Sequence, residues 1–413
     1  MSVTSLPATD SPSSADSPSS ADSRMTAAER RASLTLASIY ALRMLGLFLV
    51  MPVFALEARH YPGGDDAFLI GLAMGAYGLT QACLQVPFGL ASDRVGRKPV
   101  ILLGLAVFSL GSAIAAWAPS VTWLAVGRAV QGAGAISAAV TALLADQTRD
   151  SVRTKAMALV GISIAAMFAL SLVAAPLLTP HIGLGGLFAL TATLSLIAMA
   201  VVVWVVPPEP AHHAPAGRSG LADVLRHPDL LRVDLGVFVL HAVQIMMWLS
   251  IPALLEGAGL ARASHWQVYL PAVLVSLLVI GGALFRLERR GHFRAVYRGT
   301  ITLMVLVLLG LWWWGEALSA VGLGVCLTLF FIAFNTQEAS QPSLASRLAL
   351  PHQRGAALGV YNTLMSLGVF VGGSLGGWVL QRVGGAGIFG VAAALTVVWL
   401  AAAWGMRSES VSR

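Results

Sequence analysis

Charged residues are scarce in this chain. Only 11% of its 413 residues are Asp, Glu, Lys or Arg, whereas 57% are hydrophobic, and the mean hydropathy is +0.79. About a quarter of the residues of a typical soluble domain are charged. The composition therefore excludes a soluble globular protein and indicates a chain whose solvent is the lipid bilayer.

Cysteine is equally scarce, and the sequence lacks the motifs of several functional classes. Cys83 and Cys326 lie in apolar runs, where a thiol packs as a small hydrophobic group, so we expect no disulfide framework. The chain has no GxxxxGK[ST] loop, no HExxH and no GxSxG, which disfavours a primary pump and a membrane-embedded enzyme. Nothing resembles the repeated filter of a channel. We expect no cofactor and no metal site.

Long apolar runs follow one another from Leu34 almost to Gly405. A helix needs roughly 20 mainly apolar residues to cross the hydrocarbon, and twelve runs meet this requirement. The predicted spans are 34–56, 67–91, 99–117, 121–146, 156–178, 184–206, 233–255, 265–285, 297–315, 317–341, 355–379 and 386–405. Six plus six is the organisation of a duplicated transporter. We therefore predict an all-α membrane protein made of two six-helix halves.

Polar stretches divide the chain into five parts. Residues 1–32 are polar and contain SPSSAD twice, so we expect a disordered tail. An N-terminal bundle at 33–206 follows, and a cytoplasmic linker at 207–232 contains PPEPAHHAPAGRSG. The C-terminal bundle occupies 233–406, and 407–413 form a short C-terminal tail.

The basic residues predict the orientation in the membrane. Short cytoplasmic loops carry an excess of Lys and Arg. If the N-terminus is cytoplasmic, the cytoplasmic segments hold 21 of the 26 basic residues and the outer loops hold 3. The other two, Arg43 and Arg128, lie inside spans. We expect both termini in the cytoplasm and the chain in a bacterial inner membrane, and the spread of positive charge over many loops argues against a nucleic-acid partner.

Reporter fusions test this orientation. A reporter that is active only in the periplasm should be inactive when it is fused after Arg413, and a reporter active only in the cytoplasm should be active there. The same two reporters inserted after Arg262, in a predicted outer loop, should give the opposite pattern and serve as the control. Periplasmic activity of the fusion after Arg413 would contradict the twelve-span arrangement.

The loop between the second and third spans carries the most specific motif, GLASDRVGRK. Glycines permit a tight turn and a close approach of helices, and an Asp beside several cations can form charge-assisted links between helices. Positive charge that only sets topology is the alternative. The loop resembles motif A of the major facilitator superfamily. The matching residues are Gly89, Asp93, Arg94, Gly96, Arg97 and Lys98.

The resemblance implies that Asp93 and Arg97 latch the two halves in the outward-open state. Asp93 lies at the cytoplasmic end of the second span, and the eleventh span begins close to Gly355 on the same side. Its carboxylate could therefore sit against the positive N-terminal end of that helix. For Arg97, Asp146 at the inner end of the fourth span is the nearest partner by topology.

Two further segments resemble the same superfamily. Arg128, Gln131 and Gly132 in the fourth span match the RxxQG of motif B. Arg128 and Gly132 share a helix face, and an Arg within a span normally faces a partner or a water-filled cavity. The resemblance implies proton transfer or substrate contact, with helix packing as the alternative. In the fifth span, only Pro176 remains of the Gly-Pro and following glycines of antiporter motif C.

Longer stretches between about Arg31 and Met406 resemble the YajR-like subgroup of drug and proton antiporters. These stretches read ALRMLGLFLVMPVFAL, IGLAMGAYGLTQACLQVPFGLASDRVGRKP, RTKAMALVGIS and GGSLGGW. The resemblance implies a monomeric proton-coupled exporter of small molecules or drugs that works by alternating access. Because motif C is weakened, a proton-coupled importer is the alternative. The small cytoplasmic domain that the resemblance also implies should be lacking, since 7 residues follow Met406.

Few titratable residues lie inside the predicted spans. Asp146 and Asp234 are near cytoplasmic ends, where we expect water to reach them. Glu338 is deep in the tenth span within FNTQEAS, a polar segment that should line a cavity. It is a candidate proton carrier, unless its neighbours hold it permanently in one state. His241 is a second candidate, because imidazoles titrate near neutral pH, and packing is its alternative role. For Arg43 we expect a position that faces a cavity or another helix.

Overall fold

The structure is a computed structural model that describes residues 25–209, 221–287, 290, 292–350 and 353–406. All regular elements in these ranges are helices, and 11 of them are long and apolar enough to cross a membrane. The prediction of an all-α membrane protein is therefore confirmed. The tail residues 1–24, the linker residues 210–220 and the C-terminal residues 407–413 lie outside the described ranges.

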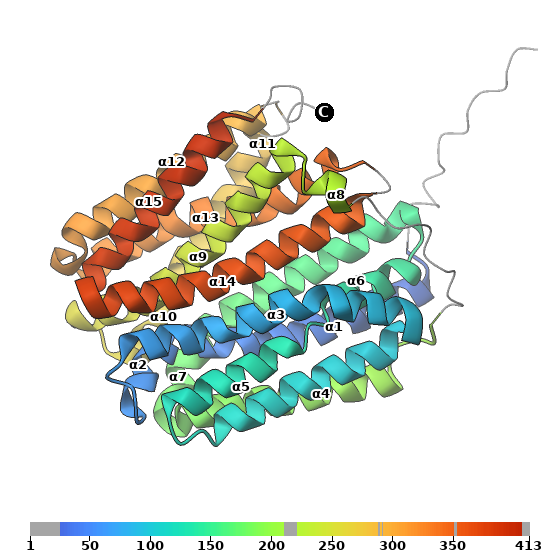
Figure 1. Ribbon diagram of the computed structural model, residues 1–413, viewed down its shortest axis with the longest axis horizontal. Coiled ribbons are helices and arrows are strands. Elements are labelled where there is room, and N and C mark those ends of the chain that lie inside the picture. The colour runs from blue at the N-terminus through green and yellow to red at the C-terminus, as the bar shows by residue number, and fades with distance from the viewer. Residues whose placement is uncertain (1–24, 210–220, 288–289, 291, 351–352, 407–413) are drawn as a thin grey trace, which may run out of the picture.

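In the N-terminal half the first helix packs against the last one, and the last one also packs against the third long helix (Figure 1). Its long elements are α1 (Ala27–Val50), α3 (Ala67–Val95), α4 (Arg97–Ala116), α5 (Val121–Ala133), α6 (Ser137–Asp146) and α7 (Asp150–Trp204). The short elements α2 (Phe54–Glu57) and η1 (Ala58–His60) join α1 to α3. The fourth predicted span, 121–146, corresponds to α5 and α6 together.

Helix α7 contains both the fifth and the sixth predicted spans. A straight helix of 55 residues would measure about 80 Å, more than twice the roughly 30 Å of hydrocarbon. The backbone leaves helical geometry at Gly183, where φ is 64° and ψ is −177°. Because a positive φ costs glycine little, the chain can turn back at this residue. The 11 long helices of the structure therefore correspond to the twelve predicted spans.

The C-terminal half is organised around α9, whose residues are mostly buried. Its long elements are α9 (Pro228–Gly257), α10 (Trp266–Val279), α12 (Phe293–Trp314), α13 (Ala320–Leu348), α14 (Arg354–Val383) and α15 (Gly385–Trp404). Its short elements are α8 (Leu221–Val224), η2 (Arg262–Ser264), η3 (Ile280–Leu284), α11 (Phe285–Leu287) and η5 (Gly315–Ala317).

The first helix begins earlier than predicted. Thr26 and Glu29 form a capping box, in which Thr26 Oγ1 accepts from the Glu29 N–H at 3.2 Å and the Glu29 carboxylate accepts from the Thr26 N–H at 2.8 Å. Arg149 donates to the same carboxylate at 2.8 Å, which ties the start of α1 to the start of α7. Residues 27–32 are therefore helical, and their assignment to the disordered tail was wrong.

Helix α14 lies between α3 and α9 and joins the two halves (Figure 1). A Cβ added to Gly71, Gly75 or Gly78 of α3 would collide with the backbone of α14, so glycine allows these helices to approach closely. We call the end of the bundle that holds Gly96 the inner end and the opposite end the outer end, following the predicted topology. The three glycines lie in the outer part of α3.

An ion pair joins the halves at the outer end. Arg262 Nη1 of η2 lies 3.2 Å from Glu57 Oε1 of α2, and Arg262 also pairs with Glu256 at the end of α9. Together with the glycine contacts between α3 and α14, this pair indicates a conformation in which the halves meet at the outer end.

Candidate functional site

A single residue turns the chain between α3 and α4. Gly96 has φ 111° and ψ 152°, a backbone conformation that residues with a Cβ rarely adopt. A Cβ at this position would also come within 3.3 Å of Glu209 Oε2. The turn places Asp93, in the last turn of α3, next to Arg97, the first residue of α4.

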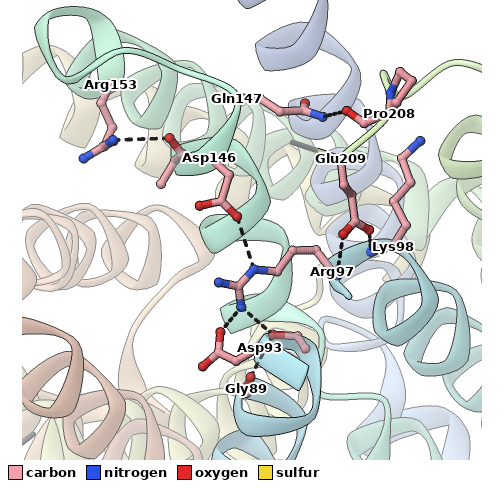
Figure 2. Close-up of polar contacts among 11 residues, drawn as sticks. Gly89, Asp93, Arg97, Lys98, Asp146, Gln147, Arg153, Pro208 and Glu209 are labelled. Atoms are coloured by element: carbon pink, nitrogen blue, oxygen red, sulfur yellow. Dashed lines mark hydrogen bonds and ion pairs between the residues drawn. The ribbon is translucent and has the colours of Figure 1, made fainter. Parts of the chain in front are cut away.

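Arg97 is the centre of a charge cluster at the inner end (Figure 2). Its guanidinium pairs with Asp93, donates from Nε to Asp146 Oδ2 at 3.3 Å, and donates from Nη1 to Ser92 Oγ at 2.8 Å. The Arg97 side chain is 15% exposed, so water solvates only part of the cluster. The structure thus brings together the Arg and both carboxylates of the predicted latch, and α6 supplies one of those carboxylates.

Glu209, a linker residue that sequence reasoning missed, is bound at the start of α4 (Figure 2). Its carboxylate accepts from the Arg97 N–H at 3.0 Å and from the Lys98 N–H. The first N–H groups of a helix have no partner within the helix, and the positive end of the helix dipole favours a carboxylate there. The signal that could have found Glu209 is the need of α4 for such an acceptor at the inner end.

The remaining motif A residues have different surroundings. Lys98 Nζ donates to the Val206 carbonyl at 2.6 Å. This hydrogen bond is a second link, beside that of Glu209, between the start of α4 and the residues that follow α7. The Gly89 carbonyl accepts from Ser92 Oγ at 2.8 Å. Arg94 is exposed, and it forms no ion pair with any described residue. The cluster therefore uses Arg97, and not Arg94, as its cation.

Motif B lies at a contact between α3, α4 and α5. Arg128 is 2% exposed and donates to Gln131 Oε1 at 3.1 Å and to the Met74 carbonyl at 3.3 Å. Gln131 in turn donates to Ser112 Oγ at 2.7 Å. A Cβ on Gly132 would collide with a backbone carbonyl of α3, so this glycine lets α3 and α5 pack beside the buried cation.

Tyr77 connects the two arginines that lie inside the spans. Arg43 is 1% exposed and its Nη2 donates to the Tyr77 hydroxyl at 2.9 Å. The Arg128 guanidinium lies over the ring of the same tyrosine, 5.1 Å from its centroid. Within the described ranges no carboxylate pairs with either arginine, so the Tyr77 side chain, the Gln131 amide oxygen and backbone carbonyls surround the two guanidinium groups. Sequence reasoning missed Tyr77, because a single Tyr in a span is ordinary.

The C-terminal half brings His241 and Glu338 together. His241 Nε2 of α9 lies 3.5 Å from Glu338 Oε2 of α13. His241 Nδ1 lies 3.0 Å from the Val237 carbonyl, and since a carbonyl only accepts, Nδ1 carries a proton. Nε2 therefore faces the carboxyl, from which it can accept a proton or to which it can donate one.

The four residues predicted to couple protons or line a cavity form two separate clusters. Arg43 and Arg128 belong to the N-terminal half, and His241 and Glu338 to the C-terminal half. The Glu338 side chain is 43% exposed, so part of it is accessible from outside the protein. Asp234, which we expected water to reach, is only 5% exposed, because α9 is the central helix of its half. Pro176 is buried inside α7, which continues through it.

These features define a multi-pass helical membrane protein with a charge cluster at the inner end of its N-terminal half. Residues 36–364 match the Major Facilitator Superfamily, and the chain belongs to this superfamily. The chain is 42% identical over 383 residues to the inner membrane transport protein YajR of Escherichia coli (strain K12), covering 92% of this chain and 84% of that protein. It is also 27% identical over 351 residues to the multidrug resistance protein MdtH of Proteus mirabilis (strain HI4320), covering 81% and 84%.

Solved structures share the fold at low sequence identity. The nucleoside transporter NupG superposes with a TM-score of 0.72 at 13% identity, covering 91% of this chain and 99% of that one. A D-xylose-proton symporter gives 0.74 at 13% identity, covering 92% and 99%. The family and the fold are those of transporters and not of enzymes, and the chain is a multi-pass protein of the inner membrane.

Proposed function

We propose that this protein is a proton-coupled secondary active transporter that exports small molecules by alternating access. The observation that carries the proposal is the His241–Glu338 pair, whose facing atoms are 3.5 Å apart in the membrane-spanning part of the C-terminal half. An imidazole nitrogen and a carboxyl oxygen at this separation are placed for proton exchange. Charges inside a span are costly and normally mark ion pathways or proton relays.

In this mechanism the pair exchanges its proton with whichever side of the membrane is open. Protonation removes the carboxylate charge of Glu338, and deprotonation restores it, so the two protonation states differ in the charge held among α9, α13 and α14. Rocking of one half against the other changes the side of access. The glycine contacts between α3 and α14 provide the surface about which such rocking would occur.

Export is the direction that the relatives favour, because the MdtH proteins are named for multidrug resistance. Import by proton symport is the competing mechanism. The two buried arginines, set against the carboxyl groups of Asp234 and Glu338, give the spans a charge balance that accepts anionic or neutral substrates as readily as cations. We therefore propose a small-molecule substrate without assigning its charge.

Transport by purified protein in liposomes tests the proposal. A panel of organic cations, neutral compounds and organic anions, beginning with ethidium, is first screened for a rise in Tm, since a ligand that binds the folded state stabilises it. The best stabiliser is then added outside liposomes with an acidic or an alkaline lumen. An antiporter accumulates it when the lumen is acidic, and a symporter does so when the lumen is alkaline. Equal accumulation with either gradient and with none would contradict proton coupling.

A further inference from the structure

The fourth span is broken near the middle of the membrane. Helix α5 ends at Ala133 and α6 begins at Ser137. Gly134 has φ −80° and ψ 54°, outside the helical range, and its carbonyl accepts from the Ile136 N–H at 2.9 Å, only two residues ahead. Such a turn interrupts the helical ladder, and backbone groups freed at membrane depth need other partners.

Two side chains of α1 donate hydrogen bonds to backbone carbonyls on either side of the break. Arg43 Nη2 donates to the Gly134 carbonyl, just after α5, at 3.2 Å. The Tyr40 hydroxyl donates to the carbonyl of Ser137, the first residue of α6, at 2.8 Å, and it lies 3.3 Å from Thr141 Oγ1. Tyr40 and Arg43 are three residues apart, so they project from the same face of α1.

Helix α4 closes the opposite side of the break. A Cβ on Gly134 would collide with the carbonyl of Gly104, and a Cβ on Gly104 would collide with the side chain of Ile136. The break is therefore enclosed between the polar face of α1 and a glycine of α4. Tyr40 and Arg43 are 6% and 1% exposed, so their hydrogen bonds form away from water, where losing a partner is costly.

The two segments that meet at the break carry different functional groups. Helix α5 carries Arg128, which shares Tyr77 with Arg43. Helix α6 is a rigid segment of 10 residues that ends at Asp146, whose carboxylate accepts from Arg97. A change in the angle between α5 and α6 therefore moves Asp146 relative to Arg97.

We propose that Tyr40 and Arg43 are positioning residues that fix the angle of α6 to α5 and thereby hold Asp146 against Arg97. Arg43 acts through Gly134 and Tyr77 and does not contact the substrate. The effect on transport rests on the proposed function, whereas the angle of α6 can be measured without any substrate.

Spin labels on either side of the break measure this angle. Cysteines replace Trp123, which is exposed on α5, and Ala142 on α6, in a chain whose Cys83 and Cys326 are changed to Ser. The separation of 19 residues predicts a single narrow distance of roughly 28 Å or somewhat less. Tyr40→Phe keeps the ring and removes both hydroxyl contacts, so the distribution should broaden or shift, and Arg43→Gln should have a larger effect.

Tyr269→Phe is the matched control. Tyr269 is fully buried in the C-terminal half, and its hydroxyl has no hydrogen-bond partner among the described residues, so its removal should leave the distance unchanged. If the double variant of Tyr40→Phe and Arg43→Gln gives the parental distribution, the positioning role is refuted.

Kinetics separate a positioning role from substrate binding. Arg43→Gln should lower the maximal rate of gradient-driven transport about tenfold, within the usual range of coupling between sites, with KM unchanged. Arg43→Lys keeps the charge but reaches only one of the two acceptors, so it should recover part of the rate. A raised KM with an unchanged maximal rate would instead make Arg43 a substrate ligand and overturn the proposal. If the parent protein shows no gradient-driven transport, the proposed function is contradicted, but the distance result is unaffected.

Discussion

Glu338→Gln should abolish transport driven by a pH gradient while the protein still binds and exchanges its substrate. Glutamine has nearly the shape of glutamic acid and can occupy the same place beside His241, but it cannot release a proton. The change therefore removes the titration and retains the packing. Substrate counterflow needs no net movement of protons, so it should continue in the variant.

Both activities are measured in the same liposomes, with the compound selected by thermal stabilisation. Glu316→Gln is the control, because Glu316 lies in the exposed outer segment η5 and its replacement removes the same charge far from His241. If Glu338→Gln transports against the gradient at the parental rate, Glu338 is not the proton carrier. Loss of counterflow together with coupled transport would also count against a pure coupling role, because it would show that Glu338 is needed for binding.

His241→Gln distinguishes the two members of the pair. Because His241 Nδ1–H is directed to the Val237 carbonyl, only Nε2 is available for exchange with Glu338. If Glu338 carries the proton, His241→Gln should slow coupled transport without abolishing it. Complete loss in both variants would show that the pair works as one unit.

Much of the fold could be predicted because hydrocarbon restricts what a chain can do. The length and apolar character of the spans located the helices, and the excess of basic residues in alternate loops predicted the orientation of the spans in the membrane. The start of α1 could have been predicted too. Thr26 and Glu29 have the spacing of a capping box, but the polar residues around them were grouped with the tail.

The break between α5 and α6 was not predictable in the same way. Apolar content is high throughout 121–146, and glycines in a span are as compatible with close packing as with a break. What makes 134–136 leave the helix is tertiary. Arg43 and Tyr40 donate to backbone carbonyls on either side of the break, and Gly104 makes room for Ile136. None of these partners is near the break in sequence.

The charge cluster was predictable in part for an electrostatic reason. A half-buried Arg needs an anion, and the topology left Asp146 as the nearest carboxylate on the same side for Arg97. Tyr77 and Glu209 were missed because their roles depend on backbone geometry. Glu209 binds the N-terminus of α4, and Tyr77 is identified only by the two guanidinium groups that approach it.

The conformation bears on what the latch should do. The halves meet at the outer end through Arg262 and Glu57 and through the glycines of α3. In this state Asp93 pairs with Arg97 of its own half, and its side chain is still 30% exposed. One face of the carboxylate is therefore available to a helix that approaches when the inner end closes.

Asp93→Asn should shift the protein toward the state that is open at the inner end. The approaching element is the N-terminal end of α14, which begins at Arg354. A carboxylate there gains from the helix dipole, and an amide gains much less. We expect the state with a closed inner end to be destabilised by roughly 1 to 3 kcal/mol, which changes the ratio of the two states about 5- to 150-fold.

Spin labels at Val203 and Leu350, which are exposed near the inner ends of the two halves, report this ratio as two distances. Arg226→Gln is the control, since Arg226 is an exposed charge on the same side of the membrane and should leave the ratio as it is. If the charges of this loop only set the orientation in the membrane, Asp93→Asn would also leave the ratio of the two states unchanged, because carboxylates contribute little to orientation. An unchanged ratio in Asp93→Asn would therefore refute the latch. A shift of Asp93→Asn toward the longer distance, with normal membrane insertion and slower transport, would place the closing contact at Asp93. The same shift in Asp146→Asn would show that Arg97 must be held between both carboxylates for that contact to form.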